Sequence, residues 1–347
     1  MAELWFAILA MTLIVFSVLD GFDFGAGALT FAVGKTEAER RSVIAAIGPF
    51  WDGNEVWLIA AGGVLFLAFP SVLAAAFPAF YLALFLVLWC LVLRGIAMEV
   101  RSHVRDSMWR SFWDVVLMLG SGLLALLFGV ALGNVVRGVP IGSGKTFTLA
   151  FFTDFTPRGE VGLLDWYTVS VGLLSFVALL AHGAAFLTYR TEGALRERAR
   201  RLERRLWIAG GALFVVVTAE TAVVRPELFE ALLRRPLAWA FTALAVAGVV
   251  FGIQAHAREH DRRTFIASAA VLGGLLAATA TALFPTMLHS TLDPARSVTA
   301  QHALSAPYGL KVALVWWPVA FALAITYLAF AFRSNREKIR SEPEAKR

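Results

Sequence analysis

The fold of this chain is decided by a long apolar run near its start. Residues 4–33 read LWFAILAMTLIVFSVLDGFDFGAGALTFAV, in which the charged side chains are Asp20 and Asp23. A helix that crosses a bilayer needs about 20 predominantly apolar residues, so this run predicts a transmembrane helix. A transmembrane strand would give weaker, alternating runs of about 10 residues. The run therefore favours an all-α membrane protein over a barrel.

The composition of the whole chain supports the same class. Of its 347 residues, 59% are hydrophobic and 16% are charged, and the mean hydropathy is +0.71. Soluble domains carry about 25% charged residues and avoid large exposed apolar patches. A disordered chain would combine low hydrophobicity with high charge. We interpret the net charge of +6 as basic cytoplasmic loops rather than as a nucleic-acid-binding surface.

Hydropathy predicts nine transmembrane segments in a single integral membrane domain, residues 1–347. The segments are residues 4–33, 44–69, 72–98, 113–136, 163–188, 206–224, 237–255, 265–288 and 312–332. Only Pro70 and Ser71 separate the second segment from the third. So short a turn predicts that these two segments form an antiparallel hairpin.

The distribution of basic residues predicts the orientation of the chain. The odd-numbered loops and the C-terminal tail carry 22 Lys and Arg, whereas the N-terminal tail and the even-numbered loops carry 8. Cytoplasmic loops are enriched in basic residues. We therefore expect the N-terminus outside and the C-terminus in the cytoplasm. The most basic loop, residues 190–205, is expected to be a solvated face near anionic lipid.

Acidic residues inside the first two segments are the best indication of function. Asp20 and Asp23, and likewise Asp52 and Glu55, are three residues apart and therefore share a helix face. From the helical rise, Asp52 and Asp23 lie about 12 and 15 Å from the inner ends of their helices. Consecutive helices are usually neighbours, so we expect all four carboxyl groups in one layer of the cytoplasmic half. They could not all be ionised there, because burial and mutual repulsion penalise charge.

Two interpretations of this acidic layer stay open from the residues alone. A cluster of acids open to the cytoplasm suits a proton relay or an ion site. Alternatively, each acid pairs with a buried arginine or caps a broken helix, and the layer is a structural polar network. We expect Arg94 to snorkel toward the interface or to pair with Glu99. We interpret His182 as a hydrogen-bonded packing residue, and we expect no metal ligand in this chain.

The sequence around the acids resembles subunit II of cytochrome bd-type ubiquinol or menaquinol oxidases. The matching stretches are DGFDFGAG at 20–27, IGPFWDGNEVWL at 47–58, AGG at 61–63, STLD at 290–293 and SAPYGLK at 305–311. Motif residues with an expected structural role are Gly21, Gly25, Trp51, Gly53, Asn54 and Trp57. The spacing of Gly21 and Gly25 is typical of closely packed helices.

The resemblance implies a heterodimer with a homologous subunit I, each built from two four-helix bundles and one peripheral helix. In such a complex, subunit I holds two b-type haems, a d-type haem and the quinol site, and none is ligated by subunit II. Oxygen is reduced to water with protons from the cytoplasm, which generates a proton-motive force. A structural quinone or lipid and a small accessory single-helix subunit are further partners of this kind. The location implied is the bacterial cytoplasmic membrane.

The resemblance also implies roles for the acids. Asp52 matches a residue of the proton route, Asp23 and Asp20 match the other acids, and Glu55 is a less constant member. Subunit II would then be a non-catalytic scaffold that lines the proton path. A secondary transporter binding its coupling ion at these acids would need inverted repeats and broken helices in both halves, and the acids lie only in the first part. A pure assembly subunit, with acids that pin helices together, is the third hypothesis.

Overall fold

The computed structural model describes residues 1–144, 146–157 and 159–340, so the end of the predicted domain, 341–347, lies outside the described residues. The first helices are α1 (Ala2–Ala28), α2 (Thr30–Val33), α3 (Glu37–Ile47), α4 (Trp51–Ala68), α5 (Pro70–Ala79), α6 (Tyr81–Val100) and α7 (Ser107–Arg137). The others are α8 (Trp166–Arg190), α9 (Gly193–Val224), α10 (Glu227–Arg234), α11 (Pro236–Ala257), α12 (Asp261–Leu283), α13 (Ala300–Ala303) and α14 (Pro307–Ser334). The predicted all-α class is confirmed.

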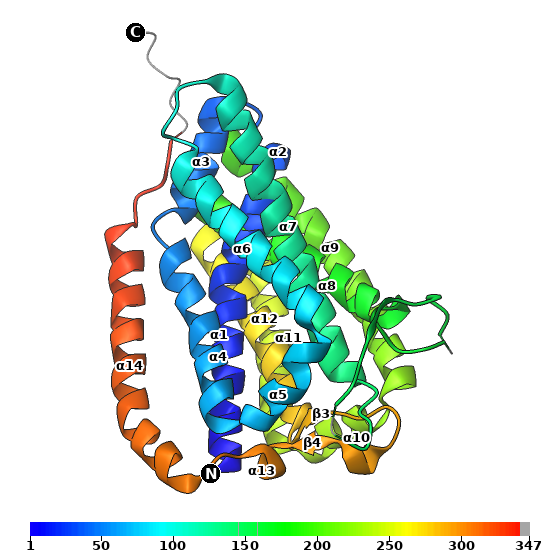
Figure 1. The fold of residues 1–347 in the computed structure, drawn as a ribbon. Coiled ribbons are helices and arrows are strands. Elements are labelled where there is room, and N and C mark those ends of the chain that lie inside the picture. The colour runs from blue at the N-terminus through cyan, green and yellow to red at the C-terminus, as the bar shows by residue number, and fades with distance from the viewer. Residues whose placement is uncertain (145, 158, 341–347) are drawn as a thin grey trace.

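The long helices form two bundles (Figure 1). In the first, α1 contacts α4 and α7, and α7 contacts α6. In the second, α8 contacts α9 and α12, and α12 contacts α11. The bundles meet where α1 lies against α8 and α12, and where α7 lies against α8. Helix α14 stands apart from both and contacts α4, which makes it the peripheral helix.

Within the described residues, eight helices are long and apolar enough to cross a membrane, and the bent pair α4–α5 brings the number to nine. The predicted tight hairpin at Pro70 is wrong. Helices α4 and α5 meet at an angle of 117°, and α5 ends at Ala79 before α6 begins. Pro70 has no N–H to continue the ladder of α4, so it starts a new helix instead. The second segment is also broken, because Gly48 and Pro49 separate α3 from α4.

Several other predicted boundaries are corrected by capping and by short strands. Helix α8 starts at Trp166 because Asp165 caps it, its Oδ1 accepting from the Thr168 N–H at 2.9 Å. The predicted basic loop 190–205 is mostly the start of α9. The eighth segment ends early, at the end of α12. The strands are β1 (Ala150–Phe152) parallel to β2 (Gly162–Leu164), and β3 (Thr286–Leu288) antiparallel to β4 (Val298–Thr299). A 3₁₀ turn, Pro294–Arg296, lies between β3 and β4.

Glycines let α1 and α8 approach each other closely. A Cβ atom on Gly25 would lie 1.9 Å from the Leu179 carbonyl oxygen, and one on Gly183 would lie 2.3 Å from the Ala26 nitrogen. No side chain fits at either position. A Cβ on Gly21 would also approach Leu179, at 2.8 Å from Cδ2. This contact agrees with the packing interpretation of the Gly21 and Gly25 spacing.

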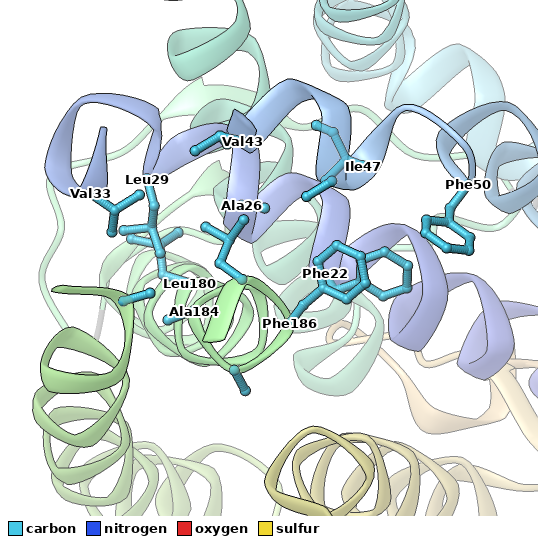
Figure 2. Close-up of a cluster of buried hydrophobic side chains, with 14 of the residues drawn as sticks. Phe22, Ala26, Leu29, Val33, Val43, Ile47, Phe50, Leu180, Ala184 and Phe186 are labelled. Carbon is cyan, nitrogen blue, oxygen red and sulfur yellow. The ribbon is translucent and has the colours of Figure 1, made fainter. Parts of the chain in front are cut away.

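An aromatic core fixes α1 next to α3 and α8 (Figure 2). The ring of Phe22 stacks on that of Phe186, with centroids 4.1 Å apart, and Ile47 of α3 belongs to the same buried cluster. The ring of Phe50 lies 4.6 Å from that of Phe332 on α14. Side chains so packed leave little freedom to the end of α1 that carries Asp20 and Asp23.

Candidate functional site

A single buried guanidinium gathers carboxyl groups from two other helices. Arg94 of α6 is fully buried, and its Nη2 lies 2.9 Å from Asp20 Oδ1 and 3.8 Å from Asp23 Oδ2. Its Nη1 lies 3.2 Å from Glu55 Oε1. We name Asp20, Asp23, Glu55 and Arg94 the Arg94 cluster. The expected pairing with Glu99 is wrong, because residues five apart point to different sides of a helix.

Two neighbours hold the Arg94 cluster in place. The Asn54 amide of α4 donates to Asp23 Oδ2 at 2.8 Å and to the Leu19 carbonyl at 3.2 Å. Cζ of Arg94 lies 4.7 Å from the centroid of the Phe24 ring, at the distance of a cation–π contact. Asn54 therefore ties α4 to α1 at the level of the acids.

Several polar atoms of the cluster have no hydrogen-bond partner among the described residues. They are Asp20 Oδ2, Asp23 Oδ1, Asn54 Oδ1 and Arg94 Nε. Buried polar atoms are normally paired, so such a concentration of unpaired ones calls for an explanation in function. Carboxylate oxygens with free lone pairs are able to accept protons.

Asp52 lies outside the buried cluster. Its residue is exposed, and among the described residues it forms no ion pair with Arg94, so the predicted layer of four acids contains three. Asp52 lies on the outer face of α4, where Val56 and Ile59 are also exposed. Glu55, one turn further along α4, has a side chain that is 24% exposed. Exposure therefore decreases from Asp52 through Glu55 to the buried Asp20.

The motif residues of α4 hold it against α6 and α14. A Cβ on Gly95 of α6 would lie 3.5 Å from the Trp51 ring, and one on Gly53 would lie 2.4 Å from Cε1 of Tyr327. The ring of Trp57 meets that of Phe321 edge to face, with centroids 5.5 Å apart. These residues position the helix that carries Asn54 and Glu55.

His182 is bound within the fold on both sides of its ring. Nδ1 lies 2.7 Å from Ser268 Oγ, and Nε2 lies 2.9 Å from the Val18 carbonyl. This arrangement confirms that it is a hydrogen-bonded packing residue. In the part of the chain that the structure describes, no group of three or more His, Cys, Asp or Glu side chains is placed to hold a metal ion.

A second charged network was missed by the sequence analysis. Asp114 of α7 is buried and pairs with Arg40 at 2.8 Å and with Arg101 at 2.5 Å. Arg101 also lies 3.4 Å from Glu37 of α3, and Glu37 pairs with Arg41 at 2.6 Å. From the sequence alone, these arginines are predicted only as loop charges. The one available signal was Asp114, an acid just inside the fourth segment.

Known proteins resemble this chain over nearly its whole length. The model of the family described as cytochrome bd terminal oxidase subunit II matches residues 1–335. The "Probable cytochrome oxidase subunit 2" of Haemophilus influenzae is 33% identical over 358 residues, which cover 95% of this chain and 92% of that protein. The "Cytochrome bd-I ubiquinol oxidase subunit 2" of Escherichia coli K12 is 31% identical over 356 residues, with coverage of 95% and 92%.

A solved structure has the same fold. A chain of the bd oxidase from Geobacillus thermodenitrificans aligns with a TM-score of 0.75 at 19% identity, over 96% of this chain and 97% of that one. The "Cytochrome bd ubiquinol oxidase subunit 2" of Bacillus subtilis is 32% identical over 333 residues, with coverage of 96% and 93%. The chain therefore belongs to the cytochrome bd terminal oxidase subunit II family and is a subunit of a quinol-oxidising oxidoreductase complex.

Proposed function

We propose that this chain scaffolds a haem-bearing subunit I and carries protons from the cytoplasm toward the site where that partner reduces oxygen. In this role it couples quinol oxidation to a proton-motive force without catalysing the redox step itself. The observation that carries the proposal is the Arg94 cluster, in which three carboxyl groups share one buried guanidinium.

The charge of the cluster favours proton exchange. One guanidinium balances one carboxylate, and isolated buried charges are strongly unfavourable. Charge balance therefore favours the protonated form of the other two carboxyl groups, whose protons can be exchanged. Ionisable residues placed in this way inside membrane helices are typical of proton relays.

The decrease in exposure from the acids of α4 to those of α1 suggests the path. Asp52 lies on the outer face, Glu55 is partly exposed, and Asp20 and Asp23 are buried. The outer face around Asp52 is otherwise apolar, with Val56 and Ile59 exposed. Asp52 lies at one end of a row of exposed apolar side chains. A carboxyl group in that position is better accommodated by a protein partner than by lipid, so we place subunit I over this face.

The same proposal includes the cofactors, the substrate and the other partners of the complex. We place the two b-type haems and the d-type haem in subunit I. Both ring nitrogens of His182 in this chain already have hydrogen-bond partners within the fold, which agrees with this placement. Quinol is the substrate, and a structural quinone or lipid and a small accessory single-helix subunit complete the assembly. The complex lies in the bacterial cytoplasmic membrane, with the C-terminus of this chain in the cytoplasm.

The substitution Asp52→Asn tests the outer end of the path, where this chain would meet subunit I. We expect oxygen consumption with quinol to slow by about tenfold or more, a modest effect for a lost proton-transfer group, while haem content stays unchanged. Asp154→Asn, at an exposed carboxylate of the loop after β1, is the matched control and should leave the rate unchanged. Loss of the assembled complex in Asp52→Asn would instead support the assembly role, and an unchanged rate would remove Asp52 from the path.

A further inference from the structure

We propose that a patch of arginines at one end of the second bundle binds the phosphate groups of anionic lipids. The patch lies in the first half of α9, at the α11–α12 connection and at the start of α12. It consists of Arg201, Arg204, Arg205, Arg258, Arg262 and Arg263, all of them exposed, and we name it the arginine patch. The proposal does not depend on the proton path.

The acidic residues at this end of the molecule form ion pairs with basic residues outside the arginine patch. Asp261 pairs with Arg196 at 2.8 Å and with Lys338 at 2.9 Å. Glu259 pairs with Arg200 at 2.8 Å, and Glu197 with Arg196 at 2.7 Å. Among the described residues, no carboxylate forms an ion pair with a member of the arginine patch. The patch therefore carries an uncompensated positive charge.

Side-chain contacts connect the segments that carry the members of the patch. Nη2 of Arg200 donates to the His256 carbonyl at 2.7 Å, and Nδ1 of His256 lies 3.6 Å from Glu203 Oε1. Arg196 reaches the first residue of α12, Asp261. Side chains from the first turns of α9 thus reach the end of α11 and the start of α12.

Each of the three helices passes from an apolar to a basic surface at the patch. Ile208 of α9 is 66% exposed, Ile253 of α11 is 66% exposed and Ile266 of α12 is 51% exposed. Ile208 follows Arg205 by three residues, which is about 4.5 Å of helix. Trp207, half-buried, lies at the same border, where membrane proteins favour tryptophan. The patch therefore lies at the depth of lipid headgroups.

The chemistry of the patch fits lipid phosphates in particular. The planar guanidinium donates two parallel hydrogen bonds to a phosphate, and it is more weakly hydrated than an ammonium group. Basic residues beside a membrane attract anionic lipid electrostatically. Acyl chains of the same lipid would cover the exposed isoleucines, so headgroup and tail both find partners.

The test is lipid retention by the complex purified with its partner subunit, measured by native mass spectrometry with phosphatidylglycerol or phosphatidylcholine added. We expect Arg201→Gln/Arg204→Gln/Arg205→Gln to weaken the binding of phosphatidylglycerol by about tenfold or more, and to leave the binding of phosphatidylcholine unaffected. The control Arg234→Gln/Arg296→Gln/Lys311→Gln removes the same charge from exposed positions at the opposite end. It should retain phosphatidylglycerol like the wild type.

Two results would overturn the proposal. One is equal retention of phosphatidylglycerol by the arginine variant and the control. The other is displacement of the lipid by an equal concentration of inorganic phosphate, which would show an anion site without lipid selectivity. Should the first variant fail to assemble, Arg258→Gln/Arg262→Gln/Arg263→Gln tests the other half of the patch with the same expected loss.

Discussion

At the scale of single residues, Arg94 unites the parts of the site. Arg94 of α6 forms ion pairs with α1 and α4. Its contacts with Asp20, Asp23 and Glu55 are the only ion pairs that join these three helices in the described residues. The two hypotheses of relay and structural network are therefore not exclusive. The same guanidinium that pins the helices also holds the acids that we propose to exchange protons.

Removing Arg94 should destabilise the protein strongly. Arg94→Gln leaves Asp20 and Asp23 buried without a counter-charge, and breaking a buried ion pair costs about 3–5 kcal/mol. Thermal unfolding of the purified complex measures the loss, and the exposed Arg105→Gln is the control. The double variant Arg94→Gln/Asp20→Asn should lose less than the sum of its single variants. Strict additivity would show that the two residues do not interact.

At the scale of elements, close helix contacts and charged ties decide how the helices are placed. The crossing of α1 and α8 depends on Gly25 and Gly183, which no side chain could replace. Helix α3 is held to α6 and α7 by Glu37, Arg40, Arg101 and Asp114. Both contacts lie next to the end of α1 that carries the acids.

The glycine contact predicts a sharp difference between two alanine substitutions. Gly183→Ala would place a Cβ 2.3 Å from the Ala26 nitrogen and force α1 away from α8. This should lower the free energy of unfolding by about 1–3 kcal/mol. A Cβ atom added at Gly62 of α4 would have no other atom within 4 Å, so Gly62→Ala should be neutral or slightly stabilising. Unfolding midpoints of the two variants measure the difference. Equal midpoints would contradict the tight crossing.

The attachment of α3 should weaken at acid pH. Burial raises the pKa of Glu37, but the hydrogen bond from Arg41 and the charges of Arg41, Arg101 and Arg110 outweigh it, so the net pKa is lowered from 4.5. The stabilisation is therefore fully present above pH 4.5 and is lost as the pH falls through the lower, folded pKa. Unfolding midpoints from pH 6 downward measure it, and Glu37→Gln should flatten that acid slope. A variant slope equal to that of the wild type would refute the role of Glu37.

At the scale of the whole molecule, the sequence predicts the long helices of the bundles better than the breaks and contacts between them. Hydropathy finds the long helices, because each is a continuous apolar run, and the family resemblance supplies their grouping. The sequence does not predict the break between α5 and α6 at Phe80, because both sides of Phe80 are equally apolar. The partner of Asp20 was missed because Arg94 is distant in sequence, 74 residues away, and no local spacing reveals such a contact.

The position of Asp52 shows the same limit. Its spacing to Glu55 places both on one side of α4, but three residues still differ by about 60° around the helix axis. That angle is enough to leave Asp52 on the outer face while Glu55 reaches Arg94. The outer faces of α4 and α14 carry many exposed apolar side chains, which in our proposal are covered by subunit I and lipid.

The most direct test of the proton path is proton uptake by the reduced complex after a pulse of oxygen, followed with a pH-indicator dye. Glu55→Gln removes the carboxyl group that links the surface to the buried acids, and Glu99→Gln changes an exposed glutamate on the neighbouring α6 as the matched control. We expect proton uptake to slow by about tenfold or more in Glu55→Gln, with unchanged haem content, and to keep the wild-type rate in Glu99→Gln. Uptake at the wild-type rate in both variants would contradict it.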